Sequence, residues 1–165
     1  AFWYNPNILP WKEYQARRHC LLAYAPTIGM EVRVQEDYGL KDFVRHVAGD
    51  IDHRCAYCYE HRLEGTAKYA AEHGFAAFTS TLLASTYQNH EAIAAAAEMY
   101  ARQYGVEFLY RDFRSNFRAG NQRARELGFY MQKYCGCVFS EADRYQKQID
   151  RDRAKFDAEE AARQG

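Results

Sequence analysis

The sequence has few prolines, no net charge and no long hydrophobic run. Its three prolines all lie within the first 26 residues, so none interrupts the chain beyond Pro26. Lysine and arginine total 22, as do aspartate and glutamate, so the chain lacks the overall positive charge typical of many nucleic-acid-binding proteins. No apolar run reaches the roughly 20 residues that cross a bilayer, and the first residues do not resemble a signal peptide. We therefore expect a cytoplasmic protein with no membrane partner.

Two common kinds of catalytic motif are also absent. The sequence has no glycine-rich loop of the P-loop or dinucleotide-binding kind. None of its six histidines has a recognisable nucleophile beside it, so a hydrolytic triad is not supported. No residue is therefore predicted to be catalytic from these motifs.

Cysteine is the residue whose pattern is most informative. Four of the five cysteines stand in two tight pairs, Cys55 with Cys58 and Cys135 with Cys137. In a cytosolic protein such clusters favour metal binding or catalysis over disulfides. Cys20 stands alone within a predicted helix, and we interpret it as a small core residue.

The first pair, Cys55-Ala56-Tyr57-Cys58, lies at the predicted start of a helix. Residues three apart on a helix share a side. The helix dipole and the neighbouring Arg54 and Arg62 favour thiolates, the form that binds metals. A thioredoxin-like dithiol fits less well, because that motif normally follows a strand directly and this one follows the polar loop 49–52.

The second pair, Cys135-Gly136-Cys137, is too close in sequence for an ordinary structural disulfide. Gly136 lets the backbone fold tightly, so that both sulfurs can meet one metal or two adjacent metals. Together the two pairs supply four soft ligands, which match a four-cysteine zinc site or an iron–sulfur cluster. The spacing does not choose between these metals.

Strands and helices are predicted to alternate along the chain. Strands are expected over residues 1–4, 30–34, 75–83 and 106–110. Helices are expected over residues 11–24, 40–47, 55–73, 91–104 and 121–127, with a final helix capped by Ser140 and Asp143. This alternation predicts one α/β domain over residues 1–145, built on a parallel sheet, and a helical tail over residues 146–165. Ligands bind beyond the carboxyl ends of such strands, which places residues 5–7, 81–89 and 111–117 on one rim.

A basic segment runs from Arg111 to Lys133, with six basic residues against Asp112 and Glu126. Phe113 and Phe117 are interleaved with its arginines. Guanidinium groups grip phosphates, and exposed aromatics stack on unpaired bases, so the segment is a candidate RNA contact. A solvated charged face with its aromatics buried fits the composition equally well.

Five short motifs, spread over the chain up to about Tyr145, carry a family resemblance. They are Tyr4-Asn5-Pro6-Asn7-Ile8-x-Pro10, Cys55-x-Tyr57-Cys58-Tyr59-x-x-Arg62-Leu63, Phe78-Thr79-Ser80-Thr81-Leu82-Leu83, Tyr110-Arg111-Asp112-Phe113-Arg114 and Gln132-Lys133-Tyr134-Cys135-Gly136-Cys137. No single motif is specific, but together and in this order they resemble the QueH type of epoxyqueuosine reductase.

The resemblance implies an oxidoreductase that reduces epoxyqueuosine to queuosine at the wobble position of tRNA, the last step of queuosine biosynthesis. It implies a [4Fe–4S] iron–sulfur cluster and an additional iron, with no cobalamin. The implied fold is a three-layer parallel-sheet domain akin to the adenine-nucleotide alpha-hydrolases, followed by a C-terminal helix. The implied partners are tRNA carrying epoxyqueuosine and an unidentified electron donor.

The four paired cysteines are carried over from the family by position, and the substrate-binding residues are predicted from their chemistry and their place in the chain. Cys55, Cys58, Cys135 and Cys137 match the family's metal-binding cysteines, and which of them hold the cluster and which another iron stays open. The predicted substrate-binding residues are Asn5, Asn7, Thr81 and Gln88 around the base and Arg111 and Arg114 on phosphates, with Tyr57, Tyr59 and Tyr87 as candidate proton donors.

This sequence departs from the family pattern at its start. The family begins with a strand followed by a His-x-Cys-Cys motif, which is absent here, so we expect a truncated fragment lacking the first strand. The activity of such a chain stays open. The alternatives are a non-catalytic nucleic-acid-binding domain with a structural four-cysteine zinc site, or an inactive truncated domain.

Overall fold

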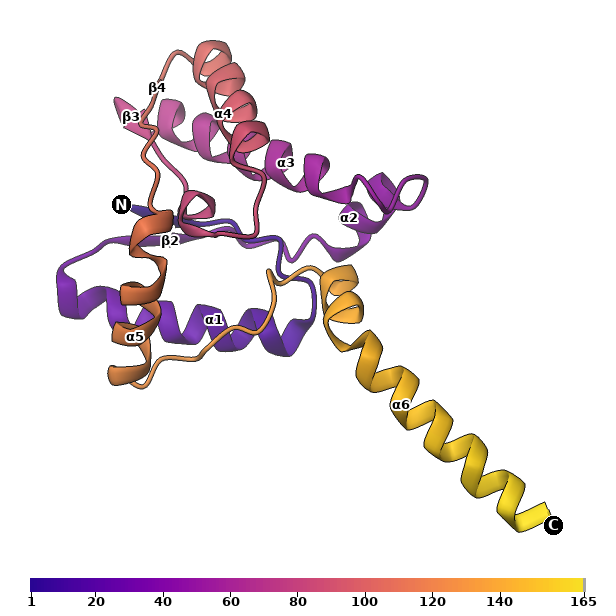
Figure 1. Cartoon of the computed structure of the whole chain (residues 1–165). Coiled ribbons are helices and arrows are strands. Elements are labelled where there is room, and N and C mark those ends of the chain that lie inside the picture. The colour runs from indigo at the N-terminus through magenta and orange to yellow at the C-terminus, as the bar shows by residue number, and fades with distance from the viewer. Residues whose placement is uncertain (165) are drawn as a thin grey trace.

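The computed structural model describes residues 1–164 as an α/β fold that is mostly helical (Figure 1). Its elements in chain order are β1 (Phe2–Tyr4), α1 (Trp11–Tyr24), η1 (Ala25–Ile28), β2 (Val32–Val34), α2 (Leu40–Val47), α3 (Arg54–Glu72), β3 (Ala77–Phe78), η2 (Thr81–Ala84), α4 (His90–Tyr104), β4 (Glu107–Phe108), η3 (Arg114–Asn116), α5 (Phe117–Glu126) and α6 (Val138–Gln164). The predicted α/β class with a C-terminal helix is confirmed.

The first four helices follow the sequence prediction closely. Helices α1 and α2 have the predicted bounds, and α3 and α4 each begin one residue earlier than predicted. Gly74 and Gly105 follow α3 and α4 with φ angles of 71° and 69°. This left-handed conformation is the usual way for a glycine to end a helix.

The strands form two separate parallel pairs in the part of the chain that the structure describes. Residues Phe2 to Tyr4 pair with Val32 to Val34, and Ala77 and Phe78 pair with Glu107 and Phe108. The prediction of parallel strands is confirmed, but these residues form two short sheets rather than one.

The strand predicted over residues 75–83 is wrong beyond Phe78. The Ser80 hydroxyl oxygen accepts a hydrogen bond from the Leu82 N–H at 3.2 Å, and the Ser80 carbonyl accepts one from the Leu83 N–H at 3.2 Å. These bonds turn the chain into the short helix η2. A serine hydroxyl can accept a hydrogen bond from a nearby backbone N–H, which in a strand would bond to the neighbouring strand.

Strand β1 lies between two helices. The Tyr4 hydroxyl donates to the Tyr14 carbonyl of α1 at 3.5 Å, whereas the Trp3 ring stacks on Tyr69 of α3 with centroids 4.9 Å apart. Successive strand residues point to opposite faces, so α1 and α3 cover opposite faces of β1. Figure 1 shows α1 on one side of the strands and α3 on the other.

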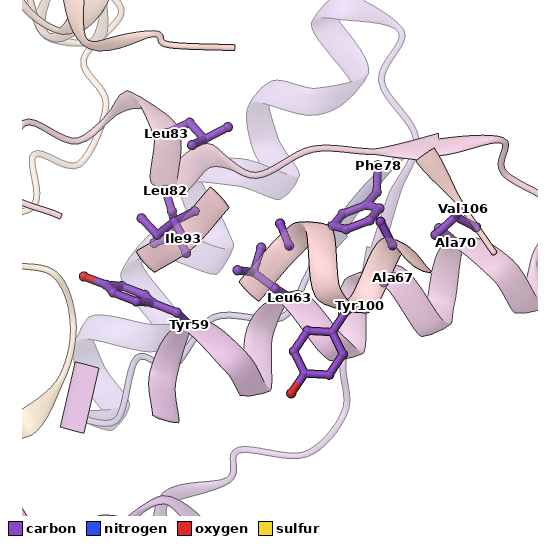
Figure 2. Packing of buried hydrophobic residues seen from close by; sticks show 12 residues of the cluster. Tyr59, Leu63, Ala67, Ala70, Phe78, Leu82, Leu83, Ile93, Tyr100 and Val106 are labelled. Carbon is purple, nitrogen blue, oxygen red and sulfur yellow. The ribbon is translucent and has the colours of Figure 1, made fainter. Parts of the chain in front are cut away.

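The largest core forms where α3 packs against α4 (Figure 2). Leu63 of α3 is 1% exposed, and Ile93 of α4 and Leu83 of η2 are fully buried. Ala67 and Ala97 are also fully buried, and their small side chains let the two helices approach closely. Burying each such leucine or isoleucine contributes about 1.5–3 kcal/mol, so this core fixes α3 firmly.

The last two helices differ from the prediction at their starts. Helix α5 begins at Phe117 rather than near Asn121. Helix α6 begins at Val138, because the Glu141 N–H donates to the Cys137 carbonyl at 3.0 Å, so the predicted cap at Ser140 is wrong. Helix α6 projects from the rest of the molecule (Figure 1), and its Ile149 and Phe156 are 50% and 63% exposed, as their thin apolar stripe predicts.

No helix within residues 1–164 is both long enough and apolar enough to span a membrane.

Candidate metal centre

The first cysteine pair lies at the start of α3. Cys55 is exposed and Cys58, one turn further along, is half-buried. Arg54, the first residue of the helix, forms an ion pair with Asp143 of α6 at 2.5 Å and donates to the Ile51 carbonyl at 3.1 Å. The helix start is therefore tied to α6 as well as to the α3–α4 core.

The second cysteine pair lies on a loop whose backbone is fixed by α1. Arg17 Nη1 and Nη2 donate to the Cys135 and Tyr134 carbonyls at 3.0 and 2.8 Å. The Leu9 N–H donates to the Gly136 carbonyl at 3.0 Å. Three backbone carbonyls in succession are thus held by residues from the other end of the chain.

Gly136 is required by this arrangement. Its φ angle is +113°, which side-chain-bearing residues rarely adopt, and an added Cβ would lie 2.8 Å from Ile8 Cγ1. Glycine therefore allows the loop to lie directly against the Ile8 side chain.

A buried carboxylate holds Arg17 in place. Glu13, one turn earlier on α1, is 8% exposed and forms an ion pair with Arg17 at 2.6 Å. The Tyr130 hydroxyl also donates to Glu13, which ties the segment before the cysteine loop to the same group. The sequence analysis missed Glu13 and Arg17, because their spacing also fits an ordinary surface ion pair.

The two cysteine pairs lie in one region of the molecule, since Tyr57, between Cys55 and Cys58, packs against the cluster that contains the buried Cys137. A negative charge on Cys135 or Cys137 raises the pKa of both Cys55 and Cys58, so the four thiols share one electrostatic neighbourhood. Within residues 1–164, no three histidine, cysteine, aspartate or glutamate side chains are grouped tightly enough to hold a metal ion. Cys20 is half-buried on α1. The predicted metal ligands thus lie in one region, and metal binding itself stays a prediction.

The prediction that local charge favours the thiolate forms of Cys55 and Cys58 is wrong. Desolvation of the sulfur atoms raises the pKa of Cys58 and also that of Cys55, although Cys55 as a whole residue is exposed. This outweighs the lowering of the pKa by Arg54 at Cys55 and by Arg62 at Cys58. Desolvation disfavours the charged form of a thiol, and the guanidinium groups compensate only in part. The sequence shows the basic neighbours of the two thiols but not how far folding removes their sulfur atoms from water.

Two unsatisfied donors lie beside Cys58. Burial raises the pKa of Cys58, and the charge of Arg62 and the nearby Asn7 amide lower it. Yet Asn7 Nδ2 and Arg62 Nε are buried without a partner that meets full hydrogen-bond geometry. Buried donors normally have acceptors, so the surroundings of Cys58 fit a group that carries negative charge and accepts hydrogen bonds. Soft thiol ligands and such donors together fit the chemistry of an iron–sulfur group.

Three of the predicted substrate-binding residues lie along the first half of α3. The Asn5 amide donates to the Arg62 carbonyl at 2.8 Å and to Thr66 Oγ1 at 3.1 Å, and Asn7 lies beside Cys58. Gln88 Oε1 accepts from the Tyr59 hydroxyl at 2.7 Å. Thr81 is exposed at the start of η2. Their role in binding substrate stays a prediction.

The basic segment is divided between paired and unpaired arginines. Arg111 lies 5.9 Å from the Phe113 ring, and Arg114 forms an ion pair with Asp112 at 2.6 Å. Arg118 and Arg125 of α5 are exposed and have no ion pair within the described residues. Phe113 packs against the core, so one of the interleaved aromatics is structural.

The three candidate proton donors differ in environment. Tyr59 is buried and bonded to Gln88, and Tyr57 stacks on His46 and His61 with centroids 4.5 and 5.6 Å away. Tyr87 is 86% exposed.

These features define a class: an α/β protein in which two cysteine pairs lie in one region, near buried cationic and amide donors. Comparison with known families is more specific. The sequence profile of the epoxyqueuosine reductase QueH family matches residues 1–143. This chain belongs to the epoxyqueuosine reductase QueH family, a family of oxidoreductases, as its motifs predicted.

Several curated relatives bear the same name, epoxyqueuosine reductase QueH. The protein of Dehalococcoides mccartyi is 37% identical over 147 residues, which are 89% of this chain and 81% of that protein. The protein of Thermotoga maritima is 35% identical over 159 residues, or 90% of this chain and 82% of that protein. The protein of Haemophilus influenzae is 33% identical over 151 residues, 86% of this chain and 61% of that protein.

Proposed function

We propose that this chain reduces epoxyqueuosine to queuosine at the wobble position of tRNA, using an iron–sulfur centre held by its paired cysteines. Two C–O bonds of the epoxide break and one C=C bond forms. Two electrons and two protons are consumed, and the oxygen leaves as water. An electron donor, whose identity stays open, supplies the electrons.

The observation that supports this proposal most is that the two cysteine pairs, from distant segments of the chain, lie in one region of the molecule. Cys55 and Cys58 are placed by a core helix, and Cys135 and Cys137 are placed by backbone bonds to α1 and Leu9. Four thiols from distant segments in one region are a suitable ligand set for an iron–sulfur group, and the family is one of reductases, which need a redox group.

The proposed ligands are Cys55, Cys58, Cys135 and Cys137, which would hold a [4Fe–4S] cluster, an additional iron, or both. When bound, such a group supplies electrons and an electron-poor iron that polarises a leaving oxygen. The chain's own residues are proposed to orient this group and to balance its negative charge. The buried, unpaired donors of Arg62 and Asn7 are proposed to bond to this group, and Arg54 places positive charge near Cys55 and Cys137.

The proposed partner is tRNA that carries epoxyqueuosine. Bases of an anticodon loop are unpaired and can be reached by a protein without opening a duplex. Asn5, Asn7, Thr81 and Gln88 are proposed to surround the modified base, and Arg111 and Arg114 to contact phosphates.

The two strand pairs are proposed to belong to one parallel sheet, the middle layer of a three-layer fold of the alpha-hydrolase type. Trp3 stacks on Tyr69 and Asn5 bonds to Arg62 and Thr66, so β1 runs toward the start of α3. Phe75 bonds to Ala70 and Gln88 to Tyr59, so the segment through β3 runs in the same direction along α3. Strands that are parallel and covered by one helix suit a common sheet.

Anaerobic purification and a tRNA assay test the proposed function. We expect a brown protein that contains iron and sulfide and, with a chemical reductant, converts epoxyqueuosine in tRNA to queuosine, detected by mass spectrometry of the digested nucleosides. A colourless protein with one zinc and no conversion would instead support the structural zinc domain. A protein that binds neither metal would support the inactive domain.

A further inference from the structure

Tyr87 stands out among the aromatic residues near the cysteine site. It lies on the loop between η2 and α4, and 86% of its surface is exposed. Its neighbour Gln88 accepts a hydrogen bond at 2.7 Å from Tyr59, the residue that follows Cys58 on α3. The exposed Tyr87 ring therefore lies next in sequence to a residue that contacts the helix turn carrying the first cysteine pair.

The loop that carries Tyr87 is held on both sides of the ring. Before it, Ser85 Oγ accepts a hydrogen bond from the Tyr87 N–H at 3.2 Å. After it, the Asn89 N–H donates to the Tyr59 hydroxyl at 3.2 Å, and Asn89 Oδ1 caps α4 through the Ala92 N–H. A large ring on a fixed backbone can bind a flat partner with little further loss of conformational entropy.

The ring of Tyr87 meets a second aromatic from a distant part of the sequence. Phe117, the first residue of α5, lies edge-on to Tyr87 with centroids 6.3 Å apart and planes at 77°. Arg118 follows it, and Arg125 lies two turns further along the same face of the helix. Both arginines are exposed and have no ion pair within the described residues.

We propose that Tyr87, backed by Phe117, is a stacking platform for one unpaired RNA base, and that Arg118 and Arg125 contact the adjoining phosphates. Every base has a flat π-face, so an exposed ring beside free guanidinium groups suits single-stranded RNA. The identity of that RNA as an anticodon loop rests on the proposed function. This role uses the ring of Tyr87, whereas a proton donor would use its hydroxyl.

Binding of a fluorescently labelled anticodon stem–loop, measured by anisotropy, tests the platform. The probe is a synthetic RNA hairpin with guanine at the wobble position, compared with a blunt RNA duplex without a loop. We expect Tyr87→Ala to weaken hairpin binding by about 5- to 100-fold, the effect of losing one stacked base, and to leave duplex binding unchanged. Tyr87→Phe is expected to bind within about twofold of wild type, because it keeps the ring.

Tyr145→Ala is the matched control, because it removes a 36% exposed tyrosine from α6, outside the platform. Hairpin binding by Tyr87→Ala equal to that of wild type would overturn the platform. Equal losses in Tyr87→Ala and Tyr87→Phe would overturn it as well, since they would assign the effect to the hydroxyl.

The same variants separate the platform from the proposed function. Weakened hairpin binding by Tyr87→Ala, in a protein that never converts epoxyqueuosine, would keep the platform and reject the reaction. Conversion of epoxyqueuosine by the wild-type protein, together with unchanged hairpin binding by Tyr87→Ala, would reject the platform and keep the reaction.

Discussion

The two cysteine pairs are held in different ways. Cys55 and Cys58 belong to a helix whose other face is buried against α4, so regular secondary structure places them. Cys135 and Cys137 lie on an irregular loop whose position depends on Arg17, Leu9 and Gly136. The first pair is therefore tied to the largest core, whereas the second pair depends on these contacts and on the small cluster that buries Cys137 with Leu9, Phe43 and Val47.

This difference bears on how a shared site is assembled. A helix supplies one rigid half, and a loop held through its backbone supplies the other half, with Cys135 exposed and Cys137 buried beside Leu9. Among the described residues, the Cys135 thiol donates a hydrogen bond to Ser140 Oγ alone, at 3.0 Å. Weakening the core should therefore affect the whole molecule, and weakening the backbone contacts of the loop should affect the loop alone.

Leu63→Ala is expected to have the largest effect. Leu63 is 1% exposed between α3 and α4, and the substitution leaves a cavity that costs about 2–5 kcal/mol. Urea denaturation should show a lower free energy of unfolding for the whole domain. Leu109→Ala, at a residue that is 50% exposed, is the control and should change stability little. A loss confined to the cysteine loop would contradict this view of α3.

Arg17→Met is expected to free the loop of the second pair. It removes the donors to the Cys135 and Tyr134 carbonyls and leaves the buried Glu13 without its cation. Losing these charged contacts should cost about 3 kcal/mol. Hydrogen exchange of the Leu9 amide, which donates to Gly136, should therefore speed up by about 100-fold.

Amides in the middle of α3 should exchange as in wild type in the Arg17→Met protein. Arg18→Met is the matched control, because Arg18 is exposed and has no ion pair within the described residues. Equal acceleration in α3 and at Leu9 would show that Arg17 supports the whole fold rather than the loop.

Gly136→Ala is expected to act on the same loop with a smaller effect. The new Cβ would meet Ile8 Cγ1 at 2.8 Å and Arg17 Nη1 at 3.2 Å, at a φ angle of +113°. Backbone strain of this kind costs about 1–2 kcal/mol, so exchange at Leu9 should rise by about tenfold. Gly120→Ala, where an added Cβ meets nothing within 4 Å, should leave exchange unchanged. Unchanged exchange in Gly136→Ala would mean that the loop adjusts without cost.

Local features of the sequence were enough to predict the helices and the first cysteine pair. Apolar periodicity and a following glycine fixed α3 and α4 to within a residue or two. The motifs that identified the family were local as well. Strand lengths were not predictable, because the single hydroxyl of Ser80 turns the chain where apolar residues continue.

Long-range contacts account for most of what the sequence did not reveal. The bonds from Arg17 to Tyr134 and Cys135 join residues that are more than a hundred positions apart, and no local pattern marks Arg17 as different from Arg18. The sign of the cysteine pKa shifts depends on how deeply folding buries each sulfur. Pairing of Tyr87 with Phe117 likewise arises only in the folded chain.

The most direct test of the central claim is the iron and sulfide content of single Cys→Ser variants after anaerobic reconstitution. The account predicts that Cys55→Ser, Cys58→Ser, Cys135→Ser and Cys137→Ser each lose at least half of the bound iron, and that Cys20→Ser keeps all of it. Full iron content in Cys135→Ser and Cys137→Ser, with loss only in the α3 variants, would contradict the claim that both pairs hold one centre.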